Sequence, residues 1–140
     1  MLTTFLFLPQ RMLLSSASPA TSYSLLVSPT RIQEGLNTNI TLNLREATVN
    51  ATLPFKLNVT SPANVSYSLN ITVSTNGTGS GSNETKFWSD FAGANTDLVG
   101  TYNVTLLNQA GNQTLATANF TVGLTDKLEY LRAETVSIRG

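Results

Sequence analysis

The chain has 140 residues with eight basic and eight acidic side chains, so only 11% of its residues are charged. This sparse, balanced charge argues against the basic face that nucleic-acid binding requires and against a polybasic membrane patch. The chain contains no cysteine and no histidine, which excludes a disulfide framework, a thiolate nucleophile and a zinc site of the usual kind. Its length allows one domain of ordinary size.

Residues 1–20 resemble a secretory signal. Leucine and phenylalanine form an interrupted apolar run, and Ser18-Pro19-Ala20 resembles a small-residue cleavage site. The run has no basic residue before it and is broken by Pro9-Gln10-Arg11, so a disordered N-terminus is the alternative interpretation. The segment is too short and too interrupted to span a bilayer as a helix. On either interpretation it lies outside the predicted domain, residues 21–124.

Alternation of apolar and polar residues predicts strands along most of residues 21–124. Pro29 is expected to stop the first strand at a sheet edge, and the glycine-rich run Asn76–Ser82 is expected to be a hairpin tip or loop. The strand before Trp88 is less regular, because Phe87 and Trp88 are adjacent and cannot both face one core. The predicted strands cover residues 23–27, 39–44, 55–60, 67–73, 85–88, 98–106 and 116–122.

This spacing of about seven strands predicts an all-β fold, an antiparallel two-sheet sandwich. No stretch shows helical periodicity, and a parallel α/β fold would need helical crossovers for which there is no room. Inward positions are mostly β-branched or aromatic, whereas outward positions are mostly Asn or Thr. Local propensity and pattern therefore predict the same architecture.

The run from Asp97 to Val104 identifies the type of sandwich. Its Asp-x-x-Gly-x-Tyr-x-Val pattern, with Asp97, Gly100 and Tyr102, resembles the tyrosine corner of immunoglobulin-like domains, in which the tyrosine hydroxyl bonds to backbone just upstream. Together with the strand spacing and the Pro and Gly residues between strands, this pattern makes the chain similar to the immunoglobulin-like and macroglobulin-type modules of bacterial and archaeal surface proteins. Val104 stands where antibody domains have their second cysteine, which favours the microbial version.

Residues 125–140 are predicted to be a linker that opens a second, similar domain. Val136 and Ile138 repeat the spacing of Ile40 and Leu42 at an offset of 96 residues, about one sandwich domain. The alternative is a C-terminal strand that folds back on the first module.

Asn-x-Ser/Thr triplets, the acceptors of N-glycosylation, are in excess. The chain has 14 Asn and 35 Ser or Thr, whose random placement would give about three or four triplets. An outward Asn and an outward Thr two residues apart on a strand create a triplet without any glycan, but Asn is depleted in strands. Heavy glycosylation explains the choice of Asn, since it covers an almost uncharged surface. The ten acceptors are Asn39, Asn50, Asn58, Asn64, Asn70, Asn76, Asn83, Asn103, Asn112 and Asn119.

Few residues are candidates for chemistry. Asp90 and Asp97 bracket Asn95 in one loop, which permits a weak calcium site, although turn formation explains these residues equally well. The glycine run Gly77–Gly81 lacks the lysine and the following helix of a phosphate-binding loop. Phe87 and Trp88 are either an exposed contact patch or one core residue and one residue at a sheet edge. We predict no catalytic residue, no metal site and no cofactor.

We therefore expect a non-enzymatic structural or adhesion module, a spacer of a glycosylated extracellular or cell-surface protein. Its partners would be other domains of the same polypeptide, neighbouring surface proteins or glycans, with no nucleic acid and no membrane span. One alternative is a self-assembling filament or surface-layer subunit, in which residues 23–27 or 136–138 add to a neighbour's sheet edge. Another is an accessory carbohydrate-binding module of a secreted enzyme that uses Trp88 and Phe87.

Overall fold

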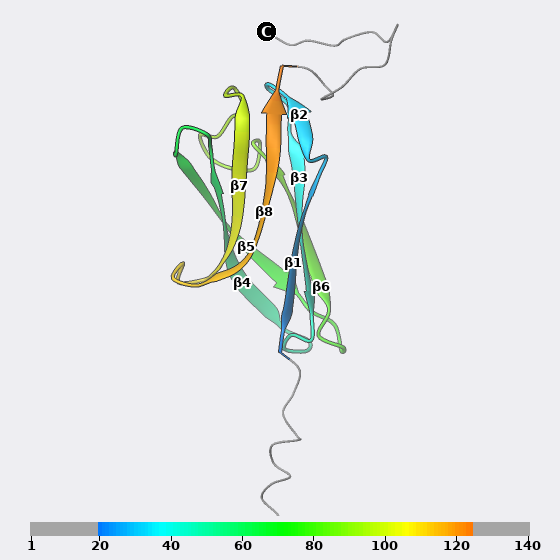
Figure 1. Ribbon diagram of the computed structural model, residues 1–140. Helices are drawn as coiled ribbons and strands as arrows, with labels where there is room; N and C mark the ends of the chain where they lie inside the picture. The colour runs from blue at the N-terminus through cyan, green and yellow to red at the C-terminus, as the bar shows by residue number, and fades with distance from the viewer. Residues whose placement is uncertain (1–19, 125–140) are drawn as a thin grey trace, which may run out of the picture.

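The computed structural model describes residues 20–124, and within them it shows an all-β sandwich of eight strands in two sheets (Figure 1). The sequence-based prediction of an immunoglobulin-like two-sheet fold is confirmed. The signal-like segment lies outside the described residues except for Ala20, and the predicted second-domain start at 125–140 lies entirely outside them.

The smaller sheet has three antiparallel strands in the order β1-β3-β6. They are β1 (Ser22–Ser28), β3 (Thr38–Arg45) and β6 (Gly81–Phe87). The larger sheet has the order β2-β8-β7-β4-β5, with β2 (Arg31–Gln33), β4 (Thr52–Thr60), β5 (Ser66–Ser74), β7 (Gly100–Asn108) and β8 (Thr114–Gly123).

Strand β2 has no counterpart among the predicted strands, and it pairs with β8 in parallel, unlike the other strand pairs. Three residues are too few to show an alternation, which is why the pattern did not reveal this strand. Its hydrogen bonds to β8 let the chain cross from the smaller sheet to the larger one between β1 and β3.

The boundaries of β6 differ from the predicted strand at 85–88. The strand begins at Gly81, inside the glycine-rich run, and Trp88 follows its end. The turn is held by the Asn76 side chain, whose Oδ1 accepts hydrogen bonds from the backbone N–H groups of Thr78 at 2.9 Å and Ser80 at 3.0 Å. A side chain at Gly81 would collide with the Ser74 carbonyl at 2.3 Å. Glycine is therefore required here by close packing of two strands, and does not mark a loop.

The core lies between the sheets and is built from the inward positions of both. Phe87, the last residue of β6, is fully buried, and its ring centroid lies 5.1 Å from that of Phe91, 5.7 Å from that of Phe120 and 5.8 Å from that of Tyr102. These edge and tilted contacts each add about 0.5–1.5 kcal/mol to simple burial. The other fully buried large side chains are Ile40, Leu42, Leu44, Leu57, Leu106, Val59, Val73, Val104 and Val122.

Candidate functional site

The loop before β7 is fixed by a hydrogen bond from the Tyr102 hydroxyl to the Leu98 carbonyl oxygen, 2.9 Å long. This is the bond that the tyrosine-corner pattern predicts. The Tyr102 ring is completely buried and stacks on Phe120 at 5.0 Å, and burial raises the pKa of Tyr102 above its usual value of 10.0. The arrangement ties a buried polar group to backbone. It provides stability and no reactive group.

Gly100 occupies the corner because no other residue fits there easily. Its φ is 141°, which L side chains rarely adopt, and a Cβ atom would lie 2.8 Å from the Pro62 ring. Asp97, the first residue of the pattern, is exposed, and its backbone N–H donates to Asn95 Oδ1 at 3.1 Å. Gly100 thus permits the close approach of the 61–65 turn, whereas Asp97 lies in a turn that the Asn95 side chain holds.

The structure provides no support for calcium at Asp90, Asn95 and Asp97. Asp90 Oδ2 accepts a hydrogen bond from the Lys86 backbone N–H at 2.7 Å, and Asn95 Oδ1 accepts the one from Asp97. Across residues 20–124 no group of three or more potential metal-binding side chains lies together. The side-chain oxygens of Asp90 and Asn95 therefore hold turns, which was the alternative interpretation of the sequence.

Phe87 and Trp88 lie in different environments. Phe87 is a core residue with no exposed surface, so a sugar-binding platform that includes it is wrong. Trp88 is half buried against the core, and its indole Nε1 donates to the Gly35 carbonyl oxygen at 3.1 Å. The pair is thus one core residue, the last of β6, and one residue just beyond the strand end.

The ten Asn acceptors fall into distinct structural classes. Asn50 and Asn64 have positive φ angles of 49° and 63°, a conformation that favours Asn in turns. Asn76 holds the β5–β6 turn, and Asn112 Oδ1 accepts a hydrogen bond from Asn108 Nδ2 at 2.8 Å. Each of these four residues has a structural reason to be Asn that is independent of any modification.

Asn83 is an inward-facing acceptor at the seam between the two sheets. Its Nδ2, the atom to which a glycan would be attached, donates to the Thr72 carbonyl of β5 at 3.1 Å. Its Oδ1 is buried and has no hydrogen-bond partner. A glycan at Asn83 would break this contact and would have to be accommodated between β5 and β6.

Four acceptors lie together on the outer face of the larger sheet, one on each of four neighbouring strands. Asn103 of β7 is directly opposite Asn119 of β8, and both are exposed. Asn58 of β4 and the exposed Asn70 of β5 occupy the same face. Around them the face carries mainly Ser and Thr, with Lys56 on β4 and Arg31 on β2 as its charged residues. The remaining acceptor, Asn39, is half buried on β3 of the smaller sheet.

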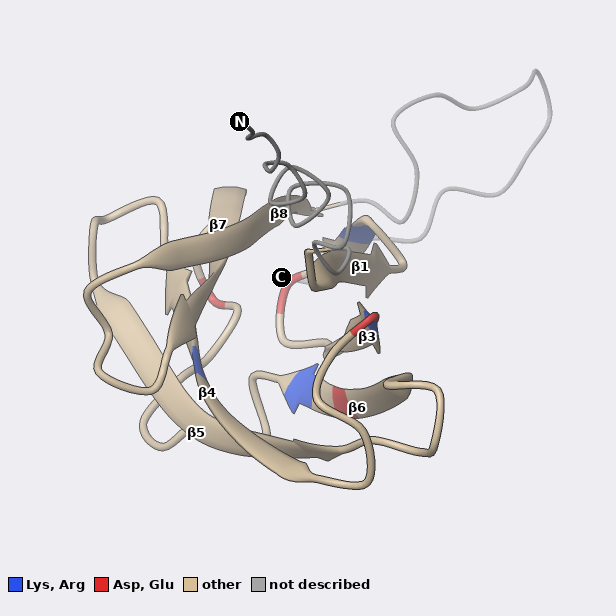
Figure 2. Cartoon of the chain, turned by 90° about the horizontal axis from the view of Figure 1, so that it is seen from below, with Lys and Arg blue, Asp and Glu red and all other residues tan. Residues whose placement is uncertain are grey.

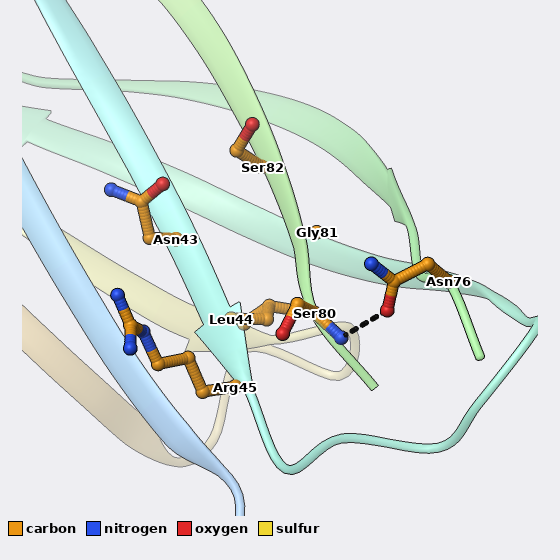
Figure 3. A pocket seen from close by; sticks show the side chains of 7 residues that line it. All are labelled: Asn43, Leu44, Arg45, Asn76, Ser80, Gly81 and Ser82. Atoms are coloured by element: carbon orange, nitrogen blue, oxygen red, sulfur yellow. Dashed lines mark hydrogen bonds between the residues drawn. The ribbon is translucent and has the colours of Figure 1, made fainter. Parts of the chain in front are cut away.

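A shallow hollow of about 460 Å³ opens where β3 ends and β6 begins (Figure 3). Its lining is polar apart from Leu44 and Gly81, and Arg45 is its single charged side chain. The other lining residues are Asn43, Asn76, Ser80 and Ser82. The hollow therefore combines hydrogen-bonding groups with one cation, but it holds no acid, no base that titrates near neutrality and no activated nucleophile. Sequence reasoning did not predict it, because pairing of β3 with β6 brings its residues together.

Charged residues are scattered over the described part of the chain, and the ribbon in Figure 2 is mostly free of them. The four basic residues between positions 20 and 124 lie on four different strands: Arg31 on β2, Arg45 on β3, Lys56 on β4 and Lys86 on β6. No pair of them shares a strand or forms a stripe. Within the same range there is no helix long and apolar enough to cross a membrane.

The chain is similar to solved structures at low sequence identity. The chain is similar to part of the Pseudomonas fluorescens alkylpurine DNA glycosylase AlkC bound to DNA with an abasic-site analogue, at a TM-score of 0.50 and 13% identity; the match covers 73% of this chain and 30% of the glycosylase. It is also similar to an immunoglobulin-like protein from Pseudomonas aeruginosa, at a TM-score of 0.40 and 12% identity, over 75% of this chain and 93% of that one.

At such low identity these similarities bear on the fold alone. The two packed sheets and the tyrosine corner are themselves the features of an immunoglobulin-like sandwich. No protein-family model and no curated protein sequence matches the chain. The chain spans less than a third of the glycosylase. Immunoglobulin-like sandwiches host many unrelated functions, so function has to be argued from the surface of this particular chain.

Proposed function

We propose that the chain is a non-enzymatic structural or adhesion module of a glycosylated extracellular protein, of the kind found on bacterial and archaeal surfaces. The observation that carries the proposal is the presence of Asn58, Asn70, Asn103 and Asn119 on one outer sheet face. Turn geometry explains Asn50, Asn64 and Asn76, but no turn requires Asn at these four strand positions. Asn is depleted in strands, so attachment of glycans supplies the missing reason.

The scarcity of charge supports the same proposal. A folded domain with few charged residues needs another hydrophilic cover to remain soluble, and glycans on the widest face of the sandwich would provide it. The scattered positions of Arg31, Arg45, Lys56 and Lys86 do not form the positive patch that a nucleic-acid interface requires. For this reason we do not extend DNA binding from the glycosylase to this chain.

The test is the mass of the protein from its native host before and after removal of glycans. We expect a clear drop, with glycopeptides at Asn103 or Asn119 and none at Asn83, whose Nδ2 is bound to Thr72. Thr105→Ala destroys the Asn103 triplet and should lower the mass by one glycan if that site is occupied. Thr101→Ala, on the same strand face but outside any triplet, should leave the mass unchanged. Equal masses before and after deglycosylation would overturn the proposal.

A further inference from the structure

Strand β5 is an edge strand that lacks the usual protection. Within residues 20–124 its only strand partner is β4, and the β4–β5 pairing runs without a bulge from Thr52–Ser74 to Thr60–Ser66. Exposed edges are normally protected by charge, proline, bulges or shortness. Strand β5 has nine residues, SYSLNITVS, with no charge and no proline. Of the other edge strands, β2 has three residues and β6 carries Glu84 and Lys86. Strand β1, SYSLLVS, is also an uncharged edge, but it lies against β8 of the larger sheet.

The hydrogen-bond pattern shows which backbone groups of β5 face away from β4. The Thr75 N–H donates to the Ala51 carbonyl at 2.8 Å, so odd-numbered residues bond toward β4. The Thr72 carbonyl accepts from Asn83 of β6, on the opposite side. Because the pairing has no bulge, the alternation continues along the strand. The N–H and C=O groups of Ser66, Ser68 and Asn70 therefore point outward.

Strand β6 covers one half of this edge and leaves the other half open. Asn83 binds Thr72, and Gly81 packs on the Ser74 carbonyl. Toward the start of β5 the ribbons of β5 and β6 diverge (Figure 1). The burial of the inward side chains also decreases from Ser74 toward Ser66. Val73 and Ile71 are buried, whereas Leu69 and Tyr67 are only half buried. Residues 66–70 thus combine unpaired backbone groups with an incompletely covered apolar strip.

We propose that this open half of β5 is a strand-addition site whose occupant is a second copy of the chain, paired antiparallel about Ser68. The unpaired groups of Ser66, Ser68 and Asn70 are symmetric about that residue, so a two-fold axis satisfies every one of them. The axis also places Tyr67 of each copy opposite Leu69 of the other, which covers the half-exposed apolar strip on both sides. No side-chain charge opposes the approach.

An arbitrary extended peptide would satisfy the backbone groups but would not match the apolar strip in this way. The covered region at residues 72–74 confines the pairing to about five residues, so the association is weak. A small interface of this type corresponds to a dissociation constant of roughly 10 to 1,000 µM. The proposal does not rest on glycosylation, because it concerns the polypeptide produced without glycans.

The experiment is analytical ultracentrifugation of the full chain, produced in a host without N-glycosylation, over a concentration series. The average mass is expected to rise from 15.0 kDa toward twice that value as the concentration increases. Ser68→Pro removes an outward N–H that β4 does not use, and Ser68→Lys adds a charge; each should keep the chain monomeric. Thr117→Lys is the matched control. Thr117 lies on β8 in line with Ser68 across the paired strands, so the substitution adds the same charge far from the β5 edge, and the variant should dimerise like the parent. A monomeric parent, or a dimer unaffected by Ser68→Lys, overturns the proposal.

A cross-linking experiment checks the geometry with a smaller change to the strand than Ser68→Pro or Ser68→Lys. The chain has no cysteine, so Ser68→Cys introduces the only one. Directly opposite residues that form a hydrogen-bonded antiparallel pair have Cα atoms about 5.5 Å apart, within the Cα range that a disulfide spans. Under mild oxidation Ser68→Cys should form a covalent dimer at least tenfold faster than Thr117→Cys. Equal rates would show that the copies do not meet at β5.

Discussion

The tyrosine corner and the open half of β5 belong to the same sheet, but their polar groups differ. Those of the corner are hydrogen-bonded within the chain, whereas the outward backbone groups of β5 are not. At the corner the Tyr102 hydroxyl is buried and bonded to Leu98, and Gly100 packs on Pro62. At β5 the outward backbone groups of residues 66–70 have no partner within the described range, and Tyr67 is half exposed. The first region stabilises the fold, and the second is available for contact. Substitutions should therefore affect stability at the corner and association at the edge.

The largest effect is expected at Phe87, through which the corner contacts the opposite sheet. Phe87→Ala removes the ring that packs against Phe91, Tyr102 and Phe120, and it should lower the free energy of unfolding by about 3–5 kcal/mol. Urea denaturation followed by circular dichroism measures the change. A loss below about 1 kcal/mol would mean that the cluster does not link the sheets.

Tyr102→Phe keeps the ring and removes only the hydroxyl, which leaves the Leu98 carbonyl without its donor. The free energy of unfolding should fall by about 1–3 kcal/mol, as for a buried hydrogen bond left half made. The same urea experiment applies. A change indistinguishable from zero would show that the hydroxyl bond is not part of the corner's stability.

Ionisation of the same tyrosine should lower the stability of the fold at high pH. Burial raises the pKa of Tyr102 in the folded state above its usual value of 10.0, because the charged form is poorly solvated there. The contribution of neutral Tyr102 to the free energy of unfolding is therefore fully present below the pKa of the unfolded state. It is lost as pH rises through the pKa of the folded state. Melting temperatures measured from pH 8 to 12 should fall more steeply in the parent than in Tyr102→Phe. Parallel curves would contradict this assignment.

Gly100→Ala tests the backbone of the corner separately from its hydroxyl. The new Cβ meets the Pro62 ring at 2.8 Å at an unfavourable φ, so a loss of more than about 1 kcal/mol is expected from chemical denaturation. Gly77→Ala is the matched control, because nothing lies within 4 Å of that Cβ and its φ is not in the positive range. Equal effects at the two glycines would show that close packing does not select Gly100.

The smallest effect on stability is expected at the edge. Ser68→Ala removes only an exposed hydroxyl bonded to Asn58 Oδ1 at 3.0 Å, and it should change the free energy of unfolding by less than about 0.5 kcal/mol. Because the backbone groups remain, it should also dimerise like the parent chain. A large loss of stability would show that the edge, like the corner, contributes substantially to the stability of the fold.

Sequence alone determined the features that depend on local alternation. The inward residues of β3, β4, β7 and β8, the two-sheet class and the position of Tyr102 follow from a period of two residues and from one short motif. The same alternation predicted that Phe87 and Trp88 would not both be core residues, and only Phe87 is fully buried. These inferences succeed because a strand that is buried on one face carries its pattern in its own residues.

Only the tertiary structure decided which strands are neighbours, and the surface features depend on that. Pairing of β4, β5, β7 and β8 collects Asn58, Asn70, Asn103 and Asn119 on one face, while the seam with β6 turns Asn83 inward. The absence of charge in residues 66–74 is visible in the sequence, but their edge position is not. Strand order is set by long-range packing of the two sheets, and a local pattern contains no information about which strand has no neighbour.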